Sequence, residues 1–158
     1  MNIQKPNLQF RNSLSVRKIT RCIVLHHADA EKFSVYQCHA CHLTNGWAGI
    51  GYHYYITKDG TIWAGRPDNT VGAHASGGNS DSIGICFEGD YDVERTMPDA
   101  QKKAGKELVA HLKAKYSIST AKKHKDITPT TCPGSLFPFD EIAGVKANGS
   151  RQKILTQN

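Results

Sequence analysis

The stretch Cys22-Ile23-Val24-Leu25-His26-His27 decides the fold class of this chain of 158 residues. A continuous apolar run of β-type residues is typical of a strand that is buried on both faces. Residues 82–89 form a second run of this kind, and its glycines predict that neighbouring backbone passes close to the strand. We therefore expect a loop-rich α/β (α+β) domain, which the scattered glycines and prolines also favour.

Helices are expected on either side of these strands in the sequence. Ser34 is suited to cap the start of the first helix, and Asn45-Gly46 is suited to end it. Pro98 and Asp99 are of the residue types that are favoured at the start of a helix, and they predict a second one. Three helices are predicted: one over residues 35–44, one that opens within residues 96–101 and runs to about residue 116, and one over residues 135–142.

A hairpin is predicted between the first helix and the second buried strand. Residues 49–57 form an aromatic strand, and the turn Lys58-Asp59-Gly60-Thr61 joins it to a short strand over residues 62–64. Tyr52 lies in the aromatic strand, where the ordinary role of a tyrosine is cross-strand packing.

Composition limits the classes of protein to which the chain can belong. Its length and its 39% hydrophobic content suit one domain with one core. The formal charge of +6 favours polyanions in general, whether nucleic acid, an anionic membrane or an anionic cell wall. Five unevenly spaced cysteines indicate reduced thiols rather than a disulfide framework. Residues 1–21 lack the apolar core of a signal peptide, and no segment suits a membrane span.

The sequence divides into three parts. Residues 1–20 are predicted to form an N-terminal strap over the surface, residues 21–143 the domain itself, and residues 144–158 a polar tail or linker.

The segment 122–134 carries the residues best suited to a metal. His124 and Cys132 supply an imidazole and a thiol, which together favour Zn²⁺, and Pro129 and Pro133 stiffen the loop that holds them. A third ligand has to come from elsewhere, and His26 at the end of the buried strand is the candidate. A His and a Cys at this spacing also occur by chance, and a buried Cys usually behaves as a small hydrophobe.

A rival metal site lies in the first predicted helix. Cys38 and Cys41 share a face of that helix, within Cys38-His39-Ala40-Cys41-His42. No second pair of ligands at zinc-finger spacing flanks it. The alternative is a helix whose thiols pack inward.

Residues 72–80, Gly72-Ala-His74-Ala-Ser-Gly-Gly-Asn79-Ser80, are too rich in small residues for a regular element. A polar loop of this kind beside a rigid sheet commonly binds a ligand.

Six separated motifs, in this order, resemble the type-2 N-acetylmuramoyl-L-alanine amidases, the family of T7-lysozyme-like endolysins and animal peptidoglycan recognition proteins. They are the strand ending in His26, Gly51-Tyr52-His53, Gly65-Arg66, Val71-Gly72-Ala73-His74, Ser82-Ile83-Gly84, and the loop from His124 to Cys132-Pro133-Gly134. The resemblance covers residues 20–143. It implies a mixed central sheet flanked by helices, with zinc in an open surface groove.

The resemblance also assigns roles to residues. His26 rather than the adjacent His27 falls on a zinc ligand, together with His124 and Cys132. Tyr52 falls on the catalytic tyrosine, and Thr130 falls where relatives carry either Lys or Thr. His74 and Asn79 fall in the loop that lines the peptidoglycan groove. Some cytosolic relatives carry a catalytic Glu at the position of Cys86, so this chain is expected to depend on Tyr52.

The function that follows is zinc-dependent cleavage between N-acetylmuramic acid and L-alanine of the stem peptide, by a phage endolysin or a bacterial autolysin. We expect a monomer that is made in the cytoplasm and acts on the cell wall after release, with no nucleic-acid or membrane partner. Two alternatives remain open. One is a non-catalytic peptidoglycan-binding module of the same fold, in which the ligand at Cys132 is usually lost. The other is a basic nucleic-acid binder built on residues 38–42, which lacks the interleaved basic and aromatic residues expected of one.

Overall fold

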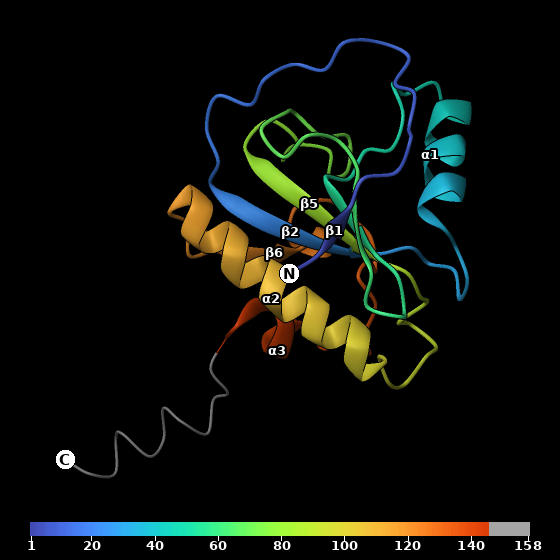
Figure 1. Cartoon of the computed structure of the whole chain (residues 1–158). Coiled ribbons are helices and arrows are strands. Elements are labelled where there is room, and N and C mark those ends of the chain that lie inside the picture. Colours follow the sequence, from blue (N-terminus) through green and yellow to red (C-terminus); the bar gives the residue numbers. More distant parts are fainter. Residues whose placement is uncertain (146–158) are drawn as a thin grey trace, which may run out of the picture.

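The computed structural model describes residues 1–145, which form a mixed sheet of six strands (Figure 1). Along the sheet the order is β1-β4-β3-β5-β2-β6, in which only the β3–β4 pair is antiparallel. The predicted mixed central sheet is therefore confirmed. Of the predicted tail, residues 146–158 lie outside the described part. The strands are β1 (Ile3–Gln4), β2 (Cys22–His27), β3 (Tyr54–Ile56), β4 (Ile62–Ala64), β5 (Ser82–Phe87) and β6 (Ala121–Lys123).

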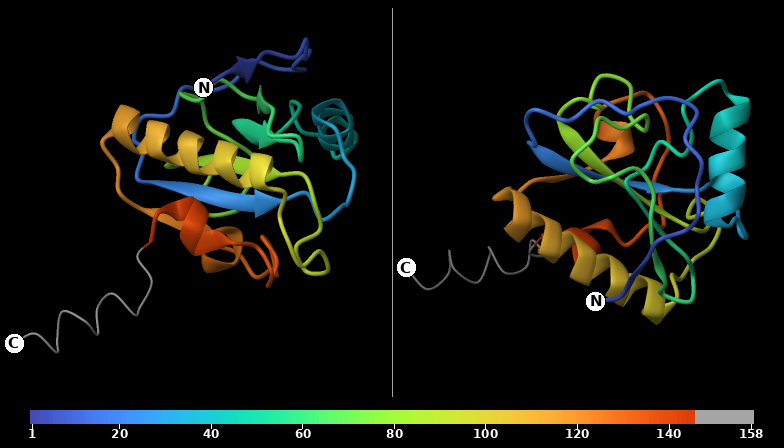
Figure 2. Two further views of the ribbon diagram at one scale, coloured as in Figure 1. Left: turned by 60° about the horizontal axis from the view of Figure 1, so that its bottom comes forward. Right: turned by 45° about the horizontal axis from the view of Figure 1, so that its top comes forward.

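Helices lie on both faces of the sheet (Figure 2). The long helix α2 (Asp99–Tyr116) and the short helix α3 (Phe139–Ala143) pack on one face, and α1 (Val35–Thr44) packs on the other. A single 3-10 turn, η1 (His124–Asp126), follows β6. In residues 1–145 no helix combines the length and the apolar character that crossing a bilayer requires.

Local signals explain where the helices begin and end. The Ser34 hydroxyl accepts the backbone N–H of Gln37, whose side chain accepts the N–H of Ser34, so a capping box begins α1 where the sequence predicts it. Helix α3 begins later than expected. Pro138 disfavours helical backbone at Phe137, so the predicted start at residue 135 is wrong.

The sheet differs from the prediction at its two edges and in the length of β3. The aromatic strand was expected over residues 49–57 but is reduced to β3. Gly51 instead pairs with the loop residue Ala73, whose N–H donates to the carbonyl of Gly51 at 3.0 Å. Strands β1 and β6 were not predicted, because both are short and polar. The N-terminal strap therefore contributes an edge strand that runs parallel to β4.

Alternation along β2 places its side chains on two different cores. Ile23 and Leu25 belong to the larger core beneath α2, whereas Val24 packs on the opposite face with Ala75. Successive side chains of a strand point to opposite faces, so His26 and His27 point apart. His27 faces the larger core and accepts the backbone N–H of Tyr91 at 3.0 Å through Nδ1.

Several buried or half-buried histidines act as acceptors for backbone N–H groups. His39 Nδ1 accepts from Ile50 at 3.0 Å, and His42 Nδ1 accepts from Gly51 at 2.8 Å, so two residues of α1 hold the segment before β3. His53 Nδ1 accepts from Gly84 at 3.0 Å, and its Nε2–H donates to the carbonyl of Thr70 at 2.7 Å. Burial lowers the pKa of both His42 and His53 to about 4. These rings are therefore neutral in the folded protein at pH 7.

We predict that the zinc-free protein loses stability as the pH falls from 6.5 to 4. His53 has a pKa of about 4 when folded, against an ordinary value of 6.5, so the unfolded chain takes up its proton first. The stability present above pH 6.5 is thus lost as the pH falls through the folded pKa. A shift of this size corresponds to about 3 kcal/mol for this one fully buried ring. Urea unfolding of chelator-treated protein at pH 7 and pH 4.5 measures the change.

Two variants control this prediction. His53→Asn is expected to be less stable than wild type at pH 7 and to lose less stability on acidification. His111→Asn, at an exposed position on α2, is expected to behave as wild type. An equal loss in all three proteins would show that His53 does not contribute to the pH dependence.

Candidate metal centre and active site

Three side chains from separate elements converge at one end of the sheet. His26 lies near the C-terminal end of β2, His124 is the first residue of η1, and Cys132 lies in the loop before α3. One potential ligand atom from each lies within 4.8 Å of the other two. The structure thus brings together the three residues that the sequence proposes as ligands.

The spacing of these atoms suits a tetrahedral metal. His26 Nδ1 and Cys132 Sγ are 3.8 Å apart. Ordinary Zn–N and Zn–S bond lengths at a tetrahedral angle place such a pair about 3.6 Å apart. His26 is 1% exposed and Cys132 is 9% exposed, whereas His124 is only partly buried. The centre is therefore closed on the side of the sheet and open beside His124.

The charge state of the three residues also fits a cation. Burial lowers the pKa of His26 well below its usual value and also lowers the pKa of His124, so both rings are neutral and carry a lone pair. Burial raises the pKa of the Cys132 thiol to about 12. A thiol in this environment becomes a thiolate in exchange for a bound cation, as zinc binding requires.

The Cys132 loop is held from two sides. The N–H of Lys125 donates to the carbonyl of Cys132 at 3.0 Å, which ties the loop to η1. Asp92 accepts the Thr131 hydroxyl at 3.1 Å and the N–H of Ser135 at 3.2 Å. Asp92 was not predicted, because an exposed acidic residue in a loop gives no signal of the distant segment that it contacts.

Tyr52 and Thr130 border the centre. The ring of Tyr52 lies 5.0 Å from the ring of His26, measured between centroids. Burial raises the pKa of Tyr52 well above its usual value, so its hydroxyl keeps its proton and acts as a hydrogen-bond donor. Thr130 is exposed, and its hydroxyl oxygen accepts the N–H of Cys132 at 3.3 Å, which leaves the hydroxyl proton available.

His74 and Asn79, in the loop 72–80, both make hydrogen-bonding contacts with other groups of the protein. His74 is 7% exposed, and its Nδ1 lies 2.9 Å from His26 Nε2. The side-chain oxygen of Asn79 accepts the N–H groups of His74 and Ala75, at 2.7 and 2.9 Å. Substrate binding by His74 and Asn79 stays a prediction. The contact between His74 and His26 was missed, because the sequence does not indicate which way a loop side chain points.

The alternative sites fit a metal less well. Cys38 Sγ lies 4.0 Å from His42 Nε2, but the other nitrogen of that ring accepts a backbone N–H. Within residues 1–145 the groups able to hold an ion do not include Cys38 or Cys41. A second group, His27 with Asp29 and Asp90, has His27 Nδ1 occupied by the N–H of Tyr91. Of the two thiols of α1 that were expected to pack inward, Cys38 does so, whereas Cys41 is exposed.

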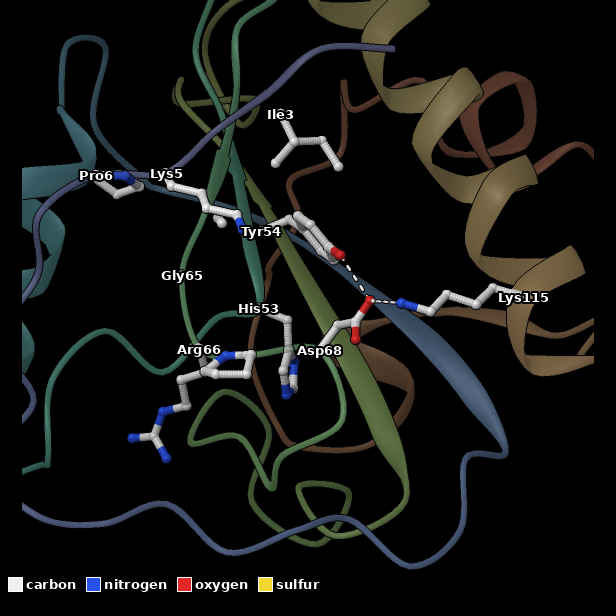
Figure 3. Close-up of a pocket in the computed structure, with 11 residues that line it drawn as sticks. Ile3, Lys5, Pro6, His53, Tyr54, Gly65, Arg66, Asp68 and Lys115 are labelled. Atoms are coloured by element: carbon white, nitrogen blue, oxygen red, sulfur yellow. Dashed lines mark hydrogen bonds and ion pairs between the residues drawn. The ribbon is translucent and has the colours of Figure 1, made fainter.

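Figure 3 shows a separate hollow in the surface. It has a volume of about 520 Å³ and lies beside β1, β3 and β4 and the C-terminal end of α2. Asp68 lies in it and accepts hydrogen bonds from Tyr54 and Lys115 at 2.8 and 2.9 Å (Figure 3). None of its lining residues is a candidate ligand. Chemistry rather than size therefore identifies the candidate active site.

Comparisons with known proteins agree with this geometry. A family model described as N-acetylmuramoyl-L-alanine amidase matches residues 16–135. The endolysin of Klebsiella phage KP32 is 38% identical over 96 residues, which span 58% of this chain and 64% of that endolysin. The match therefore extends over less than two thirds of that relative.

Solved structures give the same result over more of the chain. The N-acetylmuramoyl-L-alanine amidase LysC from Clostridium intestinale URNW superimposes with a TM-score of 0.87 at 40% identity, covering 91% of this chain and 96% of LysC. Drosophila PGRP-LB superimposes with a TM-score of 0.78 at 28% identity, covering 88% of this chain and 93% of PGRP-LB. The expected fold class and family are thereby confirmed, and the chain belongs to the N-acetylmuramoyl-L-alanine amidase family.

Proposed function

We propose that this protein is a zinc-dependent peptidoglycan amidase that hydrolyses the bond between N-acetylmuramic acid and the L-alanine of the stem peptide. The observation that carries the proposal is the convergence of His26, His124 and Cys132 within 4.8 Å at a half-open position. Three N and S ligands with one side left free are typical of a catalytic zinc site. Membership of the amidase family supports the choice of substrate bond.

The residues around the centre suit amide hydrolysis. The reaction adds a hydroxyl to the amide carbon and a proton to the leaving alanine nitrogen, so the carbonyl oxygen becomes negative in the transition state. A zinc ion bound here would lower the pKa of a water molecule and polarise the carbonyl. The Thr130 hydroxyl has a free proton with which to stabilise the oxygen. Tyr52, which remains protonated, orients water or the leaving group by donating a hydrogen bond.

A recognition module without activity is the second candidate, because PGRP-LB and other peptidoglycan-recognition proteins are similar to the chain. The complete set of ligands favours the enzyme, since a module that only binds does not need a thiol beside two imidazoles. For the enzyme we propose the bacterial cell wall as the site of action, reached after release from the cytoplasm, and a monomer as the active form.

We predict one equivalent of zinc per chain and its loss in Cys132→Ser. A serine hydroxyl stays protonated at neutral pH and is a poor replacement for a thiolate. Elemental analysis after dialysis measures the metal, and the clearing of a suspension of purified cell walls measures activity. The double variant Cys38→Ser, Cys41→Ser should keep both. If the double variant loses the metal and Cys132→Ser keeps it, the assignment of the site is wrong.

We predict that Tyr52→Phe keeps the fold and the zinc but lowers kcat by about 10- to 100-fold, in the range of one lost proton-transfer or hydrogen-bonding group. The ring still packs against His26, and only the hydroxyl is removed. Tyr36→Phe is the control, because Tyr36 is 51% exposed on α1. If Tyr52→Phe has the same kcat as wild type, Tyr52 has only a packing role.

Thr130 provides a separate test of transition-state stabilisation. Thr130→Val removes the hydroxyl at nearly constant shape and is expected to lower kcat by roughly tenfold, with zinc retained. Thr130→Ser keeps the hydroxyl and should recover most of the rate. Steady-state kinetics on a soluble muropeptide distinguish the two variants, and equal losses in both would exclude the hydroxyl as the source of the effect.

A further inference from the structure

His74 links the candidate ligand His26 to a residue on the neighbouring strand. Its Nδ1 lies 2.9 Å from His26 Nε2, and its Nε2 lies 3.2 Å from the hydroxyl oxygen of Ser82 at the start of β5. The Ser82 hydroxyl also lies 2.5 Å from the carbonyl oxygen of Gly78. His26, His74 and Ser82 are all buried, so these contacts form one connected series of buried groups.

The Ser82 hydroxyl decides where each proton lies in this series of hydrogen bonds. Two oxygen atoms 2.5 Å apart need a proton between them, and a carbonyl has none to donate, so the Ser82 hydroxyl donates to Gly78. Its single proton is then used, and Ser82 has to accept from His74 Nε2–H. A neutral imidazole with its proton on Nε2 has a lone pair on Nδ1. His74 Nδ1 therefore accepts from His26 Nε2–H.

This direction leaves His26 with its lone pair on Nδ1, the nitrogen that faces Cys132 Sγ at 3.8 Å. We propose that His74 is a positioning residue that fixes the tautomer and the ring orientation of His26 for metal binding, with Ser82 and the Gly78 carbonyl fixing His74 in turn. The inference rests on the proposed function for the identity of the metal. The order of the protons, in contrast, is a property of the protein without metal.

The sheet is shaped to hold the His74 ring. A methyl group at Gly84 would lie 2.5 Å from Cγ of His74, and one at Gly72 would lie 2.5 Å from its Cδ2. Both distances are far inside a van der Waals contact, so the ring occupies the volume that two side chains would otherwise fill. The side-chain oxygen of Asn79 accepts the backbone N–H of His74 and so holds the backbone of that residue. Ring and backbone are therefore fixed independently of any substrate.

A polar partner of this kind orients a ligating imidazole and raises its basicity, and losing one typically weakens metal binding by about 10- to 100-fold. His74 is not one of the three candidate ligands, and it reaches the centre through its contact with His26. Its expected effect is on the metal, and through the metal on the reaction.

The test compares three variants for zinc affinity, measured by competition with a chromophoric chelator. His74→Phe fills the space without an acceptor and should weaken zinc binding about 10- to 100-fold. His74→Asn places an amide oxygen near the position of Nδ1 and should recover most of the affinity. Ser82→Ala removes the acceptor for Nε2–H and should give an intermediate loss. His111→Phe, at an exposed position on α2, is the control.

Long-range ¹H–¹⁵N correlation spectra of the zinc-free wild-type protein test the proton order directly. They should show His26 and His74 both protonated on Nε2. The inference is overturned if either ring carries its proton on Nδ1, or if folded His74→Phe binds zinc as wild type does. If His74→Phe does not fold, the spectrum and the other two variants still decide. Failure of the wild-type protein to bind zinc would refute the proposed function instead, and the spectrum would still test the proton order.

Discussion

The parallel pairing of β2 with β5 is the constraint on which the candidate active site depends. Its register places Cys22 beside Ser82 and His26 beside Cys86, so residues four apart on each strand share one face of the sheet. A loop side chain, His74, then spans the distance between the Ser82 end and the His26 end of that face. A shift of one residue would turn His26 into the core beneath α2 and His27 toward the centre.

Much of the fold could be predicted because its signals are local. The apolar runs of β2 and β5 and the cap at Ser34 each act within a few residues, and the structure agrees with all three. Strands β1 and β6 could not be predicted, because they are two and three residues long and depend on pairing with distant partners. The shortening of β3 has the same origin, since Gly51 pairs with a loop and not with a strand.

The candidate site was only partly predictable for a related reason. His124 and Cys132 share one stiff loop, so their spacing in the sequence carries information about their spacing in the fold. His26 required the resemblance to a known family, because two adjacent histidines cannot be told apart without the register of the sheet. Ser82 lies in one of the motifs that carry the resemblance but had no role assigned to it, and Asp92 gave no signal. Each acts through a side-chain contact that the sequence does not identify.

The imidazole of His74 packs on the sheet at Gly84, in the space that a side chain at position 84 would otherwise fill. Strand β5 has no side chain at Gly84, and His74, in the loop that precedes the strand, places its imidazole in the same space. The two positions are therefore coupled in size: a larger residue on the strand displaces the ring, and a smaller residue in the loop leaves a hole above the strand. Redesign of this loop, for a new substrate or for a graft onto another amidase, has to exchange both positions at once.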